Sequence, residues 1–259
     1  MNVRNDHSRA YTLLELLTVL AIMGVIAALA VPTLRGLKPN AKVAATRDLL
    51  DAVGRARQLA ISQRTTVYMV FVPPSFWTAP AATAWNAADR SVAANLFDKQ
   101  LLAYTYVCLR SVGDQPGAHN PRYLSPWRTL PQGAFIAPAK FGSGMIISNT
   151  PQGNLTVWPF AITNNIPFPS ETNRAAAYVP LPYIAFDGTG QLVSGQPGQP
   201  ELIPLTEGNI SFTRDANKVA QAQPPQATEV PDGNTVDNYS LVYVDRLTGR
   251  AHVERRKVQ

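Results

Sequence analysis

The sequence predicts an α+β protein in which a long N-terminal helix packs on an antiparallel β-sheet head. Residues 11–32 form an almost unbroken apolar run. Residues 33–64 then show apolar side chains at helical spacing. After residue 64 come short runs rich in β-branched and aromatic residues, separated by proline and glycine. We therefore expect a helix in two halves, 11–32 and 33–64, followed by a β-rich head over residues 65–259.

The first half of the helix has the length of a membrane span. Residues 1–10, MNVRNDHSRA, are short and polar, and the apolar run YTLLELLTVLAIMGVIAALAVP follows directly. A span needs roughly 20 apolar residues, whereas the apolar core of a secretory signal peptide has about 7 to 15. We therefore predict that residues 11–32 cross the membrane. Two basic residues on each side of the run leave its orientation undecided by charge.

Glu15 is the one acidic residue inside this run. An ionised carboxylate in hydrocarbon is costly, so it must reach the headgroups or meet a cation. Cleavage after Ala10 would create such a cation, the α-amino group of Tyr11. The Glu15 carboxylate of one subunit could then neutralise that amine on its neighbour in a helical polymer.

The stretch A-Y-T-L-L-E-L-L-T-V-L-A-I-M-G-V-I-A resembles the N-terminal processing motif of type IV prepilins and type II secretion pseudopilins. The resemblance implies that a prepilin peptidase removes residues 1–10 as a leader, cutting between Ala10 and Tyr11, and methylates the new N-terminus at Tyr11. It also implies that Glu15, the fifth residue after the cut, serves in assembly. Alanine stands at position 10, where the family nearly always has glycine. Pro32 resembles the proline that kinks the first helix of pilins.

The second half of the helix is amphipathic, with Leu49, Val53, Ala56 and Ala60 on one face. The phrase GRARQLAISQRTTVYMVF resembles the H-type minor pseudopilins of type II secretion and the related FimT-like minor pilins. This resemblance covers about the first 72 residues. It implies a pilin-like fold in which the amphipathic stripe lies across the sheet.

The head combines strands with a long insertion. We expect the insertion at about residues 73–133, with its tryptophans packed inside rather than forming a ligand platform, and a mobile loop at about residues 216–238. The Asp-Gly-Thr-Gly segment at 187–190 predicts a hairpin turn rather than a calcium site. Strands are expected at 144–148, 154–160, 183–186 paired with 191–193, 209–213, 240–245 and 251–255.

The C-terminal segment DRLTGRAHVERRKVQ is basic, with five basic residues and one acidic residue after Asp245. In FimT-like minor pilins a C-terminal motif that begins Gly-Arg binds DNA, and residues 249–250 resemble its start, although His252 stands where the second arginine belongs. We favour the interpretation that this segment is a solvated basic edge. The alternative is that it contacts DNA phosphates through Arg250, Arg255, Arg256 and Lys257.

Nothing in the sequence predicts an enzyme, a cofactor or a metal. The three histidines are far apart, and no nucleotide-binding loop or nucleophile elbow is present. The single cysteine, Cys108, allows no intrachain disulfide. The net charge of +6 is too mild to indicate a nucleic acid partner.

These observations predict a minor pseudopilin, a structural subunit of a type II secretion pseudopilus. The resemblance implies partners: other pilins or pseudopilins through the N-terminal helix, the prepilin peptidase and the inner-membrane assembly platform. It places a single-pass chain in the bacterial inner membrane with its head in the periplasm. Two alternatives stay open, a DNA-binding minor type IV pilin and a simple membrane-anchored binding domain.

Overall fold

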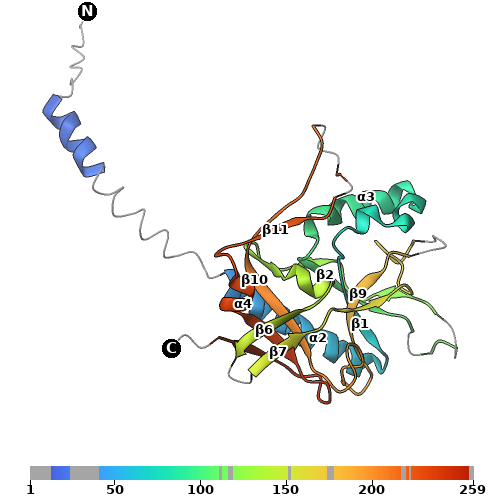
Figure 1. Ribbon diagram of the computed structural model, residues 1–259. Coiled ribbons are helices and arrows are strands. Elements are labelled where there is room, and N and C mark those ends of the chain that lie inside the picture. Colours follow the sequence, from blue (N-terminus) through green and yellow to red (C-terminus); the bar gives the residue numbers. More distant parts are fainter. Residues whose placement is uncertain are drawn as a thin grey trace, which may run out of the picture. The chain divides into compact units, whose positions relative to one another are not determined.

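The computed structural model describes residues 13–23, 41–110, 113–115, 119–150, 153–173, 178–216, 220–221 and 223–256. The chain divides into two compact units, residues 1–40 and residues 41–259 (Figure 1). The head unit thus begins at Ala41 rather than at residue 65, because the amphipathic helix belongs to the core of the head.

In the N-terminal unit, residues 13–23 form a helix. Among the described residues, no helix has both the length and the apolar character that crossing a bilayer requires. Residues 11, 12 and 24–32 of the expected span lie outside the described residues.

Helix α2, Ala41–Gln63, confirms the predicted amphipathic pattern. Leu49, Val53, Ala56 and Ala60 are all fully buried, in one hydrophobic cluster with strands of both main sheets. The hydroxyl of Tyr106 donates a hydrogen bond to the Ala52 carbonyl at 3.0 Å, which ties the helix to strand β2, Ala103–Cys108. The helix is therefore the element around which the head is built.

The first sheet has six strands in the order β3-β2-β1-β9-β8, with β4 also paired to β2, and all its pairings are antiparallel. Strong β-propensity explains its centre, where β1 is the run VYMVF. The strands are β1 Val67–Phe71, β2 Ala103–Cys108, β3 Arg122–Tyr123, β4 Arg128–Thr129, β8 Ala161–Thr163 and β9 Leu181–Phe186.

The second sheet has five antiparallel strands in the order β11-β10-β12-β13, with β5 paired to β10. One face of this sheet packs on α2 through residues such as Ile203 and Val242. The strands are β5 Ala134–Ile136, β10 Glu201–Ser211, β11 Gln226–Glu229, β12 Ser240–Val244 and β13 Ala251–Arg255.

A separate hairpin, β6 Met145–Thr150 and β7 Gly153–Val157, packs on the same sheet through a second set of side chains. Ile147 and Val157 of the hairpin form a buried cluster with Leu202, Tyr239 and Leu241. Because side chains alternate along a strand, Leu202 and Leu241 face away from Ile203 and Val242, so the hairpin covers the face of the sheet opposite α2.

Short helices complete the head. Helix α3 is Ala87–Leu96, and α4 is Asn234–Asp237. The 3-10 helices are η1 Phe76–Thr78, η2 Pro80–Ala84, η3 Phe97–Lys99 and η4 Pro138–Phe141.

The tryptophans of the expected insertion pack as predicted. Trp85 is buried, and Trp77 and Trp127 are half-buried in a cluster that surrounds Phe168. However, residues 73–133 are not only an insertion, because β2 pairs with all five residues of β1. The strand is part of the central sheet, and only its flanking segments extend from it.

The segment 216–238 also differs from the expected mobile loop. It contains β11 and α4, and both Asn234 and Thr235 are buried. Its polar side chains bind the chain itself, since the backbone N–H of Thr235 donates to the Glu229 carboxylate at 2.9 Å. The amide of Asn234 donates to the Glu207 carbonyl at 3.2 Å. Residues 217–219 and 222 lie outside the described residues.

The sheet pairings differ in a further way from expectation. The predicted strand 209–213 is the end of the longer β10, which contains Pro204. Proline normally argues against a central strand. Here it lies next to the end of the β5 pairing, and its carbonyl accepts a hydrogen bond from Ala137 at 3.0 Å. The head therefore holds two sheets and a hairpin instead of one sheet.

Candidate functional site

The helix at residues 13–23 presents apolar side chains to solvent around its whole circumference. Their exposed fractions run from 49% for Val19 to 83% for Leu13. A helix that is apolar on all sides is stable only where another apolar phase surrounds it, either lipid or neighbouring helices. The exposed residues are Leu13, Leu14, Leu16, Leu17, Val19, Leu20, Ile22 and Met23.

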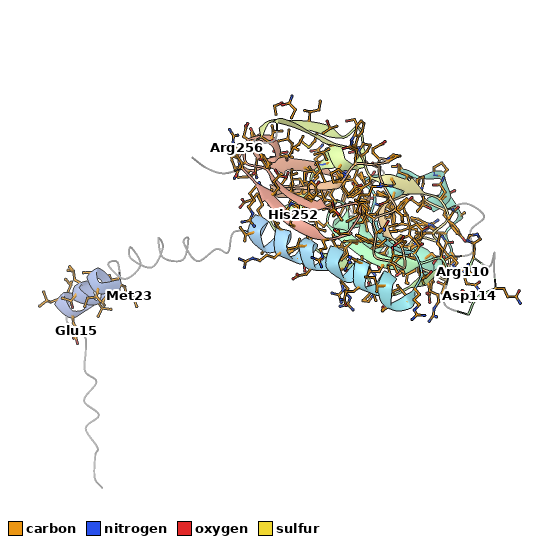
Figure 2. All side chains as sticks on the ribbon, turned by 90° about the horizontal axis from the view of Figure 1, so that it is seen from below. Glu15, Met23, Arg110, Asp114, His252 and Arg256 are labelled. Atoms are coloured by element: carbon orange, nitrogen blue, oxygen red, sulfur yellow. The ribbon has the colours of Figure 1, made fainter. Side chains whose placement is uncertain are left out.

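Glu15 is the one ionisable side chain in this helix, near its start, and Met23 lies at its other end (Figure 2). The Glu15 carbonyl accepts a hydrogen bond from the Thr18 hydroxyl at 2.9 Å. The Glu15 carboxylate is thus the one charged group on a helix whose side chains are mostly apolar and exposed. Ala10, Tyr11 and Pro32, predicted for processing and assembly, lie outside the described residues.

The geometry of the turn between β12 and β13 explains why residue 249 is a glycine, and no ligand is needed to explain it. Gly249 has φ +60°, and a Cβ atom there would come within 2.0 Å of the Gly190 carbonyl oxygen. The Asp245 carboxylate accepts hydrogen bonds from the backbone and the hydroxyl of Thr248, both at 2.7 Å. These bonds lower the pKa of Asp245, so it is ionised at neutral pH.

The structure does not gather the C-terminal arginines into one patch. Arg250 precedes β13 and Arg255 ends it, so about 17 Å of strand separates their α-carbons. Arg256 donates a hydrogen bond to the Asp237 carbonyl and lies 3.9 Å from the Asp237 carboxylate. All three side chains are exposed, and Lys257 lies outside the described residues. DNA binding by these residues stays a prediction.

The head also contains an open groove of about 910 Å³ between the β6–β7 hairpin and the second sheet. One wall comes from residues 154–156 of β7 and Trp158, and a second from residues 199, 200 and 202. The floor is formed by the end of β12 and the middle of β13, where the rings of Tyr243 and His252 lie 4.6 Å apart. Trp158 is 44% exposed.

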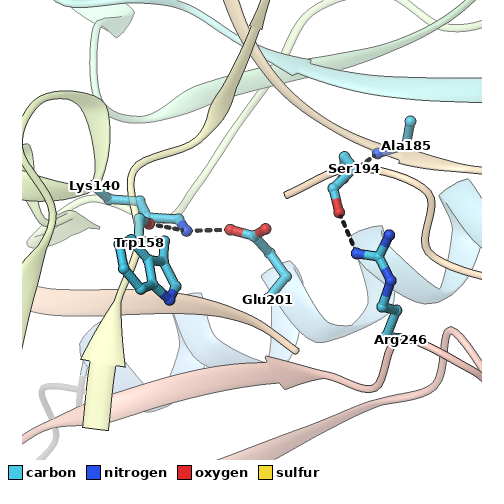
Figure 3. Close-up of polar contacts among 6 residues, drawn as sticks. All are labelled: Lys140, Trp158, Ala185, Ser194, Glu201 and Arg246. Atoms are coloured by element: carbon cyan, nitrogen blue, oxygen red, sulfur yellow. Dashed lines mark hydrogen bonds and ion pairs between the residues drawn. The ribbon is translucent and has the colours of Figure 1, made fainter. Parts of the chain in front are cut away.

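A buried ion pair joins the two walls of the groove (Figure 3). The Lys140 ammonium group contacts the Glu201 carboxylate and donates a hydrogen bond to the Trp158 carbonyl at 2.6 Å. The same ammonium lies 4.7 Å from the centre of the Phe160 ring. Lys140 therefore fixes the backbone of Trp158 relative to the start of β10.

A neighbouring set of contacts orders the chain that leads into β10. The Arg246 guanidinium donates to the Ser194 carbonyl at 3.1 Å and to the Gln196 carbonyl at 3.0 Å. The Ser194 hydroxyl accepts a hydrogen bond from the backbone of Ala185 at 2.9 Å (Figure 3). Both main sheets thus anchor the segment before residues 199–202.

Sequence reasoning did not find this groove. Trp158 and His252 are distant in the chain, and neither belongs to a known motif. A tryptophan directly after the alternating segment GNLTV is the one local indication of an exposed aromatic surface.

Comparison with known protein families gives one match: residues 5–31 fit the model described as the prokaryotic N-terminal methylation motif. This motif is the processing signal of type IV pilins and pseudopilins, and it includes Ala10, Tyr11 and Glu15. The predicted resemblance is therefore confirmed for this part of the chain. No curated protein and no solved structure matches the chain.

The motif indicates the class of protein. It supports a type IV pilin-like precursor, whose N-terminal segment is processed by prepilin peptidase and whose helix assembles with other pilins. The α+β architecture, with a helix packed on antiparallel sheets, agrees with a pilin-like fold.

Proposed function

We propose that this chain is a minor pseudopilin, a structural subunit of a type II secretion pseudopilus. The observation that carries the proposal is the methylation motif over residues 5–31, which includes the exposed apolar helix at 13–23. In this proposal the chain crosses the bacterial inner membrane once, with the head in the periplasm. The head acts as a binding and capping element and not as an enzyme.

The proposed assembly step is electrostatic. Prepilin peptidase cuts between Ala10 and Tyr11 and methylates the new amine, which keeps its positive charge. Glu15 of the neighbouring subunit then pairs with that amine within the apolar helix bundle. Two charges removed from water attract strongly, and either one alone is costly, so the pair selects one register between subunits.

The decisive experiment is the N-terminal mass of the full chain, extracted from membranes after expression with an active prepilin peptidase. We expect the wild type to begin at methylated Tyr11 and an Ala10→Leu variant to keep residues 1–10, because leucine is too bulky for the peptidase site. Asn2→Leu, the same kind of change far from the cut, is the control and should be processed. A wild-type chain that keeps its leader would favour the membrane-anchored binding domain.

A second experiment separates secretion from the other pilin-like roles. Deleting the gene in its native host should stop secretion of periplasmic substrate proteins while surface pili and DNA uptake persist. Loss of DNA uptake alone would favour the DNA-binding minor pilin. In that case an Arg255→Ala variant should also weaken salt-dependent DNA binding.

A further inference from the structure

The groove beside β7 offers an unpaired strand edge. Among the described strands, β7 pairs with β6 alone, and no residue of β6 lines the groove. The second edge of β7 therefore borders the groove along residues 154–156. A strand edge of this kind presents backbone N–H and C=O groups that an added strand can satisfy.

The charge in the groove is opposite to that of the chain as a whole. Among the described residues, its lining includes the carboxylates of Asp245 and Glu254 and no lysine or arginine, although the chain carries +6. One carboxylate oxygen of Glu254 is shielded from solvent and has no hydrogen-bond donor among the described residues. A shielded carboxylate oxygen without a donor is unfavourable, and a cationic side chain in the groove would offset the charge of this carboxylate.

Aromatic rings flank these carboxylates. Trp158 forms one wall and is partly exposed, and Tyr243 lies on the floor against His252. Aromatic faces attract cations and give large contact areas at small entropic cost. Lys140 already holds the Trp158 backbone in place, so this wall is ordered before any ligand arrives.

We propose that this groove binds an extended segment of a partner polypeptide, which adds a strand to β7 and places a lysine or arginine side chain beside Glu254 and Asp245. An oligosaccharide would leave both the strand edge and the Glu254 charge without a matched partner. The strand edge can pair with the backbone of a peptide, and the carboxylates can pair with a cationic side chain. A basic peptide strand supplies both.

This binding site is independent of the proposed assembly function, because it lies entirely in the unit formed by residues 41–259. A chain that is not processed after Ala10 would still bind the peptide. Conversely, a normally processed chain without peptide binding would overturn this inference alone.

The test is selection from a phage-displayed library of random nine-residue peptides on the full chain, held in detergent micelles. Recovered peptides are then synthesised, and their affinities are measured by fluorescence anisotropy. We expect them to contain a lysine or arginine and to lack proline at their centre. Bound peptide should also slow hydrogen exchange at backbone amides of β7.

Two variants with matched controls localise the binding. Glu254→Gln removes the charge with almost no change of shape, and Trp158→Ala removes the aromatic wall. Each should weaken peptide binding at least tenfold. Asp232→Asn and Ile162→Ala make the same kinds of change at exposed residues outside the groove and should leave binding unchanged.

Several results would overturn the proposal. These are selection of no peptide, selection of peptides without basic residues, or equal binding by Glu254→Gln and wild type. Cellopentaose is the probe for a carbohydrate, and its binding with loss in Trp158→Ala would reassign the groove to a sugar. Self-association of the chain that Trp158→Ala abolishes would reassign it to a second copy.

Discussion

Lys140 and Glu201 form an ion pair that is almost fully shielded from solvent, at 0% and 4% exposure of their side chains. Burial lowers the pKa of Lys140 and raises that of Glu201, and each charge partly offsets the effect on the other. Removing one partner leaves an uncompensated buried charge, whereas removing both leaves apolar volume. The ion pair thus fixes the position of the chain segments that it joins more than it adds to the net stability of the fold.

A double-mutant cycle tests this view. Lys140→Met and Glu201→Leu should each lower the free energy of unfolding by about 3–5 kcal/mol. The free energy of unfolding of the double variant should fall by far less than the sum of the two single losses, because no unpaired charge remains. Urea unfolding of the full chain in mild detergent, followed by tryptophan fluorescence, gives the three values. Simple additivity of the two single changes would contradict coupling between these side chains.

Lys42 gives a pH-dependent prediction. Its ammonium donates a hydrogen bond to the Asn234 side chain at 2.7 Å and another to the Asn238 carbonyl, and burial lowers its pKa from 10.5 to about 8. Between about pH 8 and pH 10.5 the unfolded chain therefore binds more protons at this residue than the folded chain. The free energy of unfolding must then rise with pH across this window, by at most about 1.4 kcal/mol per pH unit.

The measurement is the free energy of unfolding from pH 7 to pH 11 for wild type and for Lys42→Met. Tyrosines also titrate in this range, so the difference between the two proteins isolates Lys42. We expect the free energy of unfolding of the wild type to increase relative to that of the variant as pH rises above about 8. A difference that stays flat or falls would show that Lys42 remains protonated in the folded chain.

At the scale of elements, α3 depends on a side-chain cap. Asn86 precedes the helix, and its side-chain oxygen accepts a hydrogen bond from the backbone N–H of Asp89 at 2.8 Å. Asn86→Ala should lower the free energy of unfolding by about 1 kcal/mol, since one N–H of the first turn loses its partner. Asn86→Ser keeps an acceptor and should cost much less. The measurement is urea unfolding of both variants. Equal losses of unfolding free energy in the alanine and serine variants would exclude a capping role for Asn86.

The elements that could be predicted are those whose own residues determine them. Helix α2 follows from the helical period of its apolar residues, and β12 and β13 follow from their β-branched and alternating residues. Strands β5 and β8 have three residues each and exist because longer neighbours pair with them. No local pattern of that length distinguishes a strand from a loop.

The same contrast holds for the functional surfaces. The N-terminal motif is contiguous, so its residue types and spacing were enough to predict it. The groove is assembled from β7, the start of β10, the end of β12 and the middle of β13. Its position depends on how the hairpin packs on the second sheet, which the sequence pattern does not specify.

For the head as a whole, α2 holds the two sheets together. The Arg57 guanidinium donates hydrogen bonds to the Gly190 carbonyl at 3.2 Å and to the Thr248 carbonyl at 2.8 Å. The first carbonyl belongs to the turn after β9 in the first sheet, and the second to the turn between β12 and β13 in the second sheet. One side chain of the central helix thus fixes the relation between the two sheets.

At the scale of the assembled molecule, the Glu15 carboxylate is the group on which subunit register depends in the proposed function. Glu15→Gln keeps the shape of the side chain but removes its charge, so the methylated amine of the neighbouring subunit stays unpaired. Breaking such a pair costs about 3 kcal/mol or more, which corresponds to at least a hundredfold weaker association. The measurement is recovery of the chain with sheared pseudopili, alongside its level in the membrane and its N-terminal mass.

Membrane level and processing should stay unchanged in Glu15→Gln, while recovery with the filament falls. Thr18→Val is the matched control, because it removes the hydrogen bond to the Glu15 carbonyl but leaves the carboxylate. That variant should still assemble. Wild-type recovery of Glu15→Gln would mean that the apolar surface of residues 13–23 suffices for assembly and that the carboxylate reaches the headgroups instead, where water replaces the neighbouring amine as its partner.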